Sequence, residues 1–292
     1  MSDSHVSRRK FFMHSAHKTV GVSAGLAVLR TYELGDFAVA GEAEQALRVC
    51  LVSGCPLYQS DESLALLGDY LEEQGKAKCS RAFSQKEDDL PGLENLETSD
   101  CMVLFARRMT IDGEPLERIK RYCGRGGAIV AVRTASHAFQ NWLQMDKEVL
   151  GGDYQGHFDN KLTEVQIVEA AKDHPVLAGV KPFASRGTLY KNPNLAKDAT
   201  LLLRGTFPGQ TYPVAWVRRA PTGQGTDGHR SEALVALVPR DGRVGRGGRV
   251  FYTSLGHPTD FGNPSFLRLL ANAVSWTCAQ QRDRDWGLGI GD

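Results

Sequence analysis

Short apolar runs alternate with amphipathic segments along the first part of the chain. The run Ala128–Val132 is apolar at every position, which is typical of a central strand buried on both faces of a sheet. Other strands are predicted at Leu47–Gly54, Lys76–Phe83 and Cys101–Ala106, and helices at Ser60–Gln74, Leu93–Glu97 and Pro115–Gly124. This alternation predicts an α/β fold with a doubly wound, mostly parallel, flavodoxin-like sheet and right-handed crossovers.

The pattern changes in the second half. Polar and apolar residues alternate in Thr163–Glu169, as in a half-exposed strand. Further strands are predicted at Ala199–Phe207, Tyr212–Arg219, Ala233–Val238 and Arg249–Ser254, with Gly-rich hairpin loops at Thr222–His229 and Asp241–Gly248. Asn263-Pro264 caps a last helix. We expect an antiparallel extension of the same sheet, one domain over residues 41–281, and a flexible tail at 282–292.

A sharp polar turn follows the strand Ala128–Val132. It contains Arg133, Ser136 and His137, and it leads into a predicted helical stretch that ends at Trp142. Residues that follow a parallel strand lie at the carboxyl edge of the sheet, where free helix N–H groups bind anions. The planar donor fork of Arg133 suits a carboxylate, a phosphate or paired sugar hydroxyls. The structural alternative is an ion pair that covers the sheet edge.

Two further segments combine glycine with titratable residues. The loop Gly151–Phe158 contains His157, and its glycines permit close approach to a ligand. His157 is a candidate general acid, general base or metal ligand, and the alternative is a surface hydrogen bond. The segment Gly256–Asp260 follows a predicted strand and precedes the last helix, so His257 also occupies a strand end.

Composition excludes several function classes. The chain has 292 residues, of which 41% are hydrophobic and 24% are charged, as in ordinary globular proteins. The net charge of +1 gives no reason to expect binding to nucleic acid or to an acidic membrane surface. No run of 18 apolar residues is present, so we expect no membrane span.

The amino terminus has the pattern of an export signal. Ser7–Met13 matches the twin-arginine pattern, and the weakly apolar stretch Val20–Leu29 follows it. Ala38-Val39-Ala40 offers a cleavage site, although Glu33 and Asp36 precede it and make cleavage less certain than export. We therefore expect residues 1–40 to engage the twin-arginine export machinery, and the mature protein to be periplasmic or extracellular. The alternative is a disordered basic tail.

The cysteines favour a structural role. None of the six forms a Cys-x-x-Cys pair, and Cys50, Cys101 and Cys123 lie in apolar segments, where a thiol acts as a small hydrophobic group. Substrates of the twin-arginine route generally fold before export, so disulfides are not required.

The order of strand, turn and helix around Arg133 resembles the nucleophile elbow of class I glutamine amidotransferase-like folds. Those folds present a cysteine in the sequence Gly-x-Cys-x-Gly, whereas this chain reads Ala131-Val132-Arg133-Thr134-Ala135. A guanidinium that stays protonated is not a nucleophile. His257-Pro258 resembles the context of the catalytic histidine in the same family. His257 therefore resembles the histidine of a dyad whose nucleophile is missing here. The resemblance implies a shared fold without amidotransferase activity.

Several stretches together resemble the ThuA-like, or trehalose utilisation, family. They are GGAIVAVRTASHAF, LGGDYQGHF, HPVLAGV, YPVAWVRR and GRVFYTSLGHPTDFGNPSFLRLLANAVSW, and they span nearly all of Leu47–Thr277. The resemblance implies the class I glutamine amidotransferase-like α/β fold and a link to the utilisation of trehalose and related sugars. Many relatives carry a histidine at the position of Arg133, so a metal or acid-base role of that histidine does not transfer to this chain. The segment Ala220–Gly248 is longer than usual and is expected to shape the mouth of the site or a homo-oligomer contact.

Three hypotheses follow from these observations. The first is an exported hydrolase or lyase that acts on a disaccharide or an oxidised glycoside. The second is a non-catalytic carbohydrate-binding protein. The third is a metal site formed by His137, His157 and His257, although their spacing is not that of a short metal motif.

The first hypothesis assigns a role to each candidate residue and requires no cofactor or metal. Its catalytic residues are His257, His157, Arg133 and His137, and its substrate-binding residues are Ser136, Asp153, Tyr154, Trp142 and Asp260. Tyr154 and Trp142 are expected to stack on sugar faces. A small sugar is the expected partner.

Overall fold

The computed structural model describes residues 46–86, 88–219 and 248–285. The predicted signal peptide, the strand Ala233–Val238 and the loop Thr222–His229 lie outside these ranges. The same holds for the segment Ala220–Gly248, except its last residue, and for residues 286–292 of the tail.

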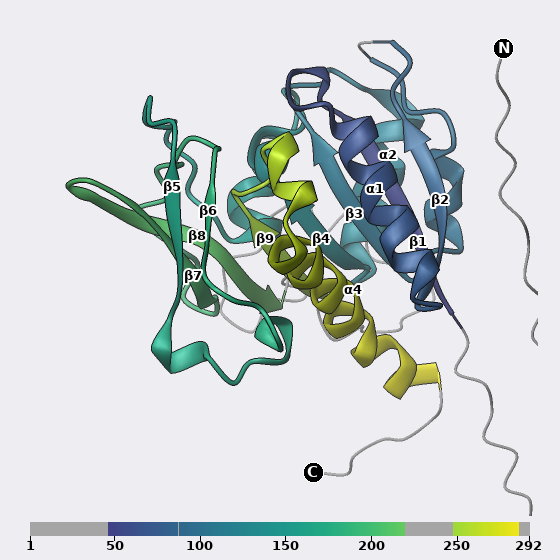
Figure 1. Ribbon diagram of the computed structural model, residues 1–292. Coiled ribbons are helices and arrows are strands. Elements are labelled where there is room, and N and C mark those ends of the chain that lie inside the picture. The colour runs from purple at the N-terminus through teal and green to yellow at the C-terminus, as the bar shows by residue number, and fades with distance from the viewer. Residues whose placement is uncertain (1–45, 87, 220–247, 286–292) are drawn as a thin grey trace, which may run out of the picture. The chain divides into compact units, whose positions relative to one another are not determined.

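All the strands of the described residues belong to one mixed sheet, with the order β2-β1-β3-β4-β9-β8-β7-β5-β6 (Figure 1). The first five strands in this order run parallel, and β8, β7, β5 and β6 extend the sheet in antiparallel pairs. The bounds are β1 Leu47–Gly54, β2 Ala77–Phe83, β3 Cys101–Ala106, β4 Ala128–Val132, β5 Thr163–Ile167, β6 Phe183–Ser185, β7 Thr200–Phe207, β8 Gln210–Arg219 and β9 Arg249–Thr253. The predicted fold, a parallel sheet with an antiparallel extension, is confirmed.

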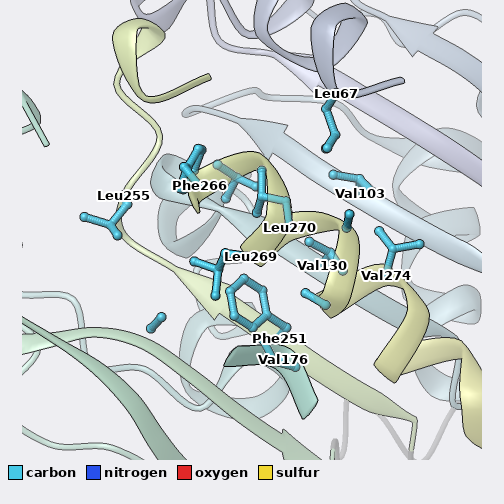
Figure 2. Close-up of a cluster of buried hydrophobic side chains, with 14 of the residues drawn as sticks. Leu67, Val103, Val130, Val176, Phe251, Leu255, Phe266, Leu269, Leu270 and Val274 are labelled. Carbon is cyan, nitrogen blue, oxygen red and sulfur yellow. The ribbon is translucent and has the colours of Figure 1, made fainter. Parts of the chain in front are cut away.

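Alternate residues of the parallel strands point into two separate apolar layers. On one face, Val103, Val130 and Phe251 pack with Leu67 and Leu270 (Figure 2). These two leucines belong to the helices α1 (Ser60–Glu73) and α4 (Pro264–Asp285). The residues next to them along the strands point to the other face, where they pack with α2 (Gly113–Gly124). Figure 1 shows α1 and α4 on one side of the parallel strands and α2 on the other. Two buried faces explain why these strands are apolar at nearly every position.

The carboxyl ends of β1, β3, β4 and β9 meet at one edge of the sheet. Gly54 pairs with Ala106, Leu104 with Ala131, and Val132 with Thr253, so neighbouring strands end at nearly the same level. The segments that follow these strands therefore converge, as expected for ligand sites of open parallel sheets.

Three details differ from the sequence predictions. The helical stretch after β4 is a 3-10 helix that ends at His137, because the N–H groups of Arg108 and Met109 bond to the carbonyl oxygens of His137 and Ala138 at 2.8 and 2.7 Å. These bonds hold the chain extended beside the end of β3. The short strand β6 was not predicted, and α4 continues to Asp285, beyond the predicted start of the tail.

Candidate functional site

Arg133 lies directly after β4 in a strained backbone conformation. Its φ angle is +50°, in the left-handed region that residues with a Cβ rarely adopt, and its side chain is 1% exposed. Gly256 lies opposite with a φ of +120°, and a Cβ there would come within 2.7 Å of Val132 Cγ1. Only glycine fits this close approach. Local strain of this kind is often found at functional sites.

The guanidinium of Arg133 is held between two tyrosine rings. Its central carbon lies 4.1 Å from the ring centre of Tyr58 and 5.1 Å from that of Tyr190. Nη1 donates to the carbonyl oxygen of Ser254 at 3.0 Å, and Nη2 donates to Tyr58 Oη at 3.1 Å and Thr188 Oγ1 at 3.4 Å. Nε is buried and has no partner in the described part of the chain.

Arg133 forms no ion pair with any carboxylate among the described residues. The structural alternative of an ion pair at the sheet edge therefore does not apply there. A buried cation without an ion-pair partner is costly, and here carbonyl, hydroxyl and π-face contacts offset that cost.

His137 lies in the same 3-10 helix (Arg133–His137) and is buried. Its ring stacks on Tyr154 with 4.5 Å between ring centres, and its Nδ1 lies 3.0 Å from Ser136 Oγ. Burial, together with the charges of Arg108, Arg107 and Arg133, lowers the pKa of His137 to about 4. The imidazole is therefore neutral at pH 7.

His157 lies on the loop after Leu150 and approaches Tyr190. The backbone of this loop pairs with the segment around Tyr190, since Gln155 N–H bonds to Lys191 O and Phe158 N–H to Leu189 O, both at 2.9 Å. The ring centre of His157 lies 6.3 Å from that of Tyr190. Its Nδ1 lies 3.1 Å from the carbonyl oxygen of Phe158, which can only accept a hydrogen bond. Nδ1 therefore carries the proton, and Nε2 of the neutral ring is a proton acceptor.

His257 has the opposite tautomer. It caps the 3-10 helix Pro258–Gly262, and its Nδ1 accepts the backbone N–H of Thr259 at 3.3 Å and lies 2.9 Å from Thr259 Oγ1. Because Nδ1 accepts, Nε2 of the neutral ring carries the proton. Burial lowers the pKa of His257; Asp260 opposes that shift, and Arg133 and Arg186 add to it.

Asp260 fixes the backbone on which His257 lies. One carboxylate oxygen, Oδ2, accepts the N–H groups of Gly256 and His257 at 2.9 and 3.0 Å and the hydroxyl of Ser185 at 2.8 Å. The side chain is 3% exposed, and burial raises its pKa. Asp260 therefore positions His257, and its Oδ2 is already occupied by three donors.

Asp146 lies behind the loop that carries Tyr154. It begins the π-helix Asp146–Leu150, and its Oδ2 accepts the backbone N–H of Tyr154 at 2.8 Å. Its Oδ1 is buried without a partner among the described residues, and a Cβ on Gly152 would lie 2.5 Å from it. Burial raises the pKa of Asp146 to about 6.

The structure groups most of the predicted site residues but separates two of them. Arg133, His137, Tyr154 and His157 join Tyr190 in one aromatic and cationic cluster. Trp142 is 4% exposed in the apolar layer on the α2 side, so it presents no ring face for a sugar, and that expectation is wrong. The carboxylate of Asp153 faces Lys147 at 3.3 Å and Asn194 at 2.9 Å instead of the cluster.

Sequence reasoning missed several members of the cluster. Tyr58 follows β1, and Arg107 and Arg108 follow β3, so the strand-end rule that selected Arg133 points to them as well. Thr188 and Tyr190 lie in the irregular segment after β6, which no local pattern marks.

Two absences apply to the described residues. None of their histidine, cysteine, aspartate and glutamate side chains come together in a group of three that could hold a metal ion, so His137, His157 and His257 do not form the hypothetical metal site. In the same ranges, no helix has the length and apolar character needed to cross a membrane.

Comparisons with known proteins agree with this architecture. The profile of the ThuA family, described as trehalose utilisation, matches residues 49–277. A ThuA-like protein from Parabacteroides merdae is similar in structure, with a TM-score of 0.58 and 16% identity over 80% of this chain and 91% of its own. A second, from Bacteroides uniformis, has a TM-score of 0.55 and 14% identity over 82% and 94% of the two chains. No curated protein matches this chain at a significant level.

Proposed function

The chain belongs to the ThuA, or trehalose utilisation, family, and we propose that it is an exported enzyme of hydrolase or lyase type that cleaves a disaccharide or an oxidised glycoside. His157 acts as the base, His257 acts as the acid, and Arg133 holds an oxygen-rich group of the substrate. No cysteine nucleophile takes part, because Arg133 occupies the turn where an amidotransferase would present one.

One observation carries this proposal: the two histidines have opposite tautomers on the segments that surround Arg133, His157 against Tyr190 and His257 directly after Gly256. The bond to Phe158 O leaves Nε2 of His157 as an acceptor, whereas the bond from Thr259 N–H leaves Nε2 of His257 as a donor. Cleavage of a glycosidic bond needs both a base, which removes a proton, and an acid, which protonates the leaving oxygen. These opposite hydrogen-bond orientations support that division of labour.

The proposal is tested by replacing His257 with alanine and with glutamine. His174 provides a matched control, because its Nδ1 also accepts a backbone N–H, that of Val176 at 3.2 Å, and its ring packs on Trp276. The assay offers a panel of disaccharides and their oxidised derivatives and detects products by mass spectrometry. The kcat of His257→Ala is expected to be lower than that of the wild type by about 100-fold or more. His174→Gln is expected to keep kcat, and both variants to keep a cooperative thermal transition. Full turnover by His257→Ala would remove the acid assignment.

The second candidate function is carbohydrate binding without turnover. The observation that favours it is the number of contacts already made by Arg133, whose guanidinium is fixed by Ser254, Tyr58 and Thr188. Calorimetry with the same panel separates the two functions, since saturable heat without any product supports the binding protein and contradicts the enzyme.

The export part of the proposal rests on residues 1–40 alone. Fusion of this segment to a reporter enzyme is expected to deliver the reporter outside the cytoplasm, and replacement of both Arg8 and Arg9 by lysine is expected to stop delivery. Equal delivery by the double-lysine variant would contradict the twin-arginine route.

A further inference from the structure

Four arginines at or near the carboxyl edge of the sheet have no ion-pair partner among the described residues. Arg107 and Arg108 follow β3, Arg133 follows β4, and Arg186 lies beside the segment of His257. Among the described residues, none of these four guanidinium groups has a carboxylate in ion-pair distance. Arg48, in contrast, pairs with Asp100 at 2.7 Å.

Three of these charges act on the same pair of rings. The charges of Arg107, Arg108 and Arg133 each act to lower the pKa values of both His137 and Tyr154, whose ring centres are 4.5 Å apart. The backbone of Arg108 has a φ of +50°, and its N–H donates to the carbonyl oxygen of His137 at 2.8 Å. This second strained arginine is thus fixed directly beside His137 and remains exposed.

The acidic groups nearby do not neutralise these arginines. Oδ2 of Asp260 is occupied by two backbone N–H groups and the hydroxyl of Ser185. Asp146 is buried behind the backbone of Tyr154, and Asp159 approaches only His157, at 3.9 Å. Asp260 acts on Arg133 without forming an ion pair with it, and none of the described carboxylates pairs with Arg107 or Arg108. Unpaired positive charges of this kind favour the binding of anions.

We propose that the ligand of this site is an anionic sugar, which carries a carboxylate or phosphate group that is bound by Arg108 together with Arg107. This inference rests on the proposed function and specifies its substrate class. The sugar ring lies against the partly exposed ring of Tyr154, and its anionic group serves as the counter-ion that the described residues do not provide. Arg108 is more exposed than Arg107, so it makes the contact that the ligand reaches first.

The experiment is calorimetry at pH 7 and low ionic strength with charged and neutral sugars of matched shape. The pairs are glucuronate against glucose and glucose 6-phosphate against glucose, with inorganic phosphate as the anion alone. The variants are Arg108→Gln and, as a matched control, Arg204→Gln, which removes an exposed arginine of β7. Thermal unfolding checks that both variants remain folded.

A charged sugar is expected to bind about tenfold or more tightly than its neutral partner, the strength of one charge-assisted hydrogen bond. Arg108→Gln is expected to remove this advantage, higher salt to reduce it, and Arg204→Gln to leave it unchanged. Preference for glucuronate or for glucose 6-phosphate identifies the anionic group as carboxylate or phosphate.

Equal affinity for charged and neutral sugars would overturn the inference, as would an unchanged charge preference in Arg108→Gln. Inorganic phosphate that binds as tightly as any sugar anion would also overturn it, because the site would then take a free anion. The outcomes remain distinct from those of the catalytic proposal. A charged sugar that binds without forming product supports the inference and contradicts the proposed enzyme. Turnover without any preference for charged sugars supports the enzyme and contradicts the inference.

Discussion

Asp146 gives a quantitative prediction about stability, because it is a buried carboxyl group with one unpaired oxygen. Burial raises its folded-state pKa from the ordinary 3.8 to about 6. The folded protein therefore holds the proton more tightly than the unfolded chain does. Its contribution to stability is fully present below pH 3.8 and is lost as the pH rises through about 6.

The magnitude follows from the separation of the two pKa values. At about 1.4 kcal/mol for each unit of pKa, the full difference corresponds to roughly 3 kcal/mol, of which roughly 2 kcal/mol is lost between pH 4 and pH 7. Asp146→Asn cannot ionise, so its free energy of unfolding lacks this decline. The amide adds donors beside Gly152, which lowers the stability of the variant by a similar amount at every pH. This constant loss does not affect how the difference between wild type and variant changes with pH.

The assay is urea unfolding at several pH values between 4 and 8, followed by tryptophan fluorescence. Trp216 is a suitable probe, because it is fully buried and donates through Nε1 to Leu150 O at 2.8 Å, at the end of the π-helix that Asp146 begins. The wild-type free energy of unfolding minus that of Asp146→Asn is expected to fall by about 2 kcal/mol from pH 4 to pH 7. Asp159→Asn, which replaces a fully exposed carboxylate, is the control and is expected to change stability by less than about 0.5 kcal/mol. Parallel pH curves for wild type and Asp146→Asn would refute the reasoning.

Two further substitutions test the geometry of the site. Gly256→Ala places a Cβ 2.7 Å from Val132 Cγ1 at a φ of +120°, so we expect a loss of about 2–4 kcal/mol in the free energy of unfolding, measured in urea; an unchanged midpoint would contradict the close approach. Trp142→Phe removes part of a core side chain, so we expect about 1–3 kcal/mol of destabilisation with no change in Kd for any sugar, and a weaker Kd measured by calorimetry would place Trp142 in the site after all.

The family resemblance and the order of elements were readable from the sequence. β1, β3 and β4 have the predicted bounds, because an unbroken apolar run has no stable alternative to a strand buried on both faces. The strand-end rule also selected Arg133 and His257 correctly as residues of one sheet edge, since both follow parallel strands that are direct neighbours.

The partners of these residues were not readable in the same way. Tyr58 and Tyr190 enclose the guanidinium of Arg133 from segments 75 and 57 residues away along the chain, so no local periodicity connects the three. Trp142 shows the reverse error: an aromatic residue next to a site motif turned inward, because the chain is pulled against the end of β3 by the bonds of Arg108 and Met109.

The sequence by itself determined where strands and helices form and which polar residues end up at the carboxyl edge, because hydrophobic periodicity and strand ends are local properties. Only the tertiary structure decided the charge and proton positions at that edge. The neutral state of His137, the opposite tautomers of His157 and His257, and the missing counter-ions of the arginines depend on burial and on hydrogen-bond partners. Burial is a sum over neighbours from distant segments, and it becomes defined only once the strands have paired.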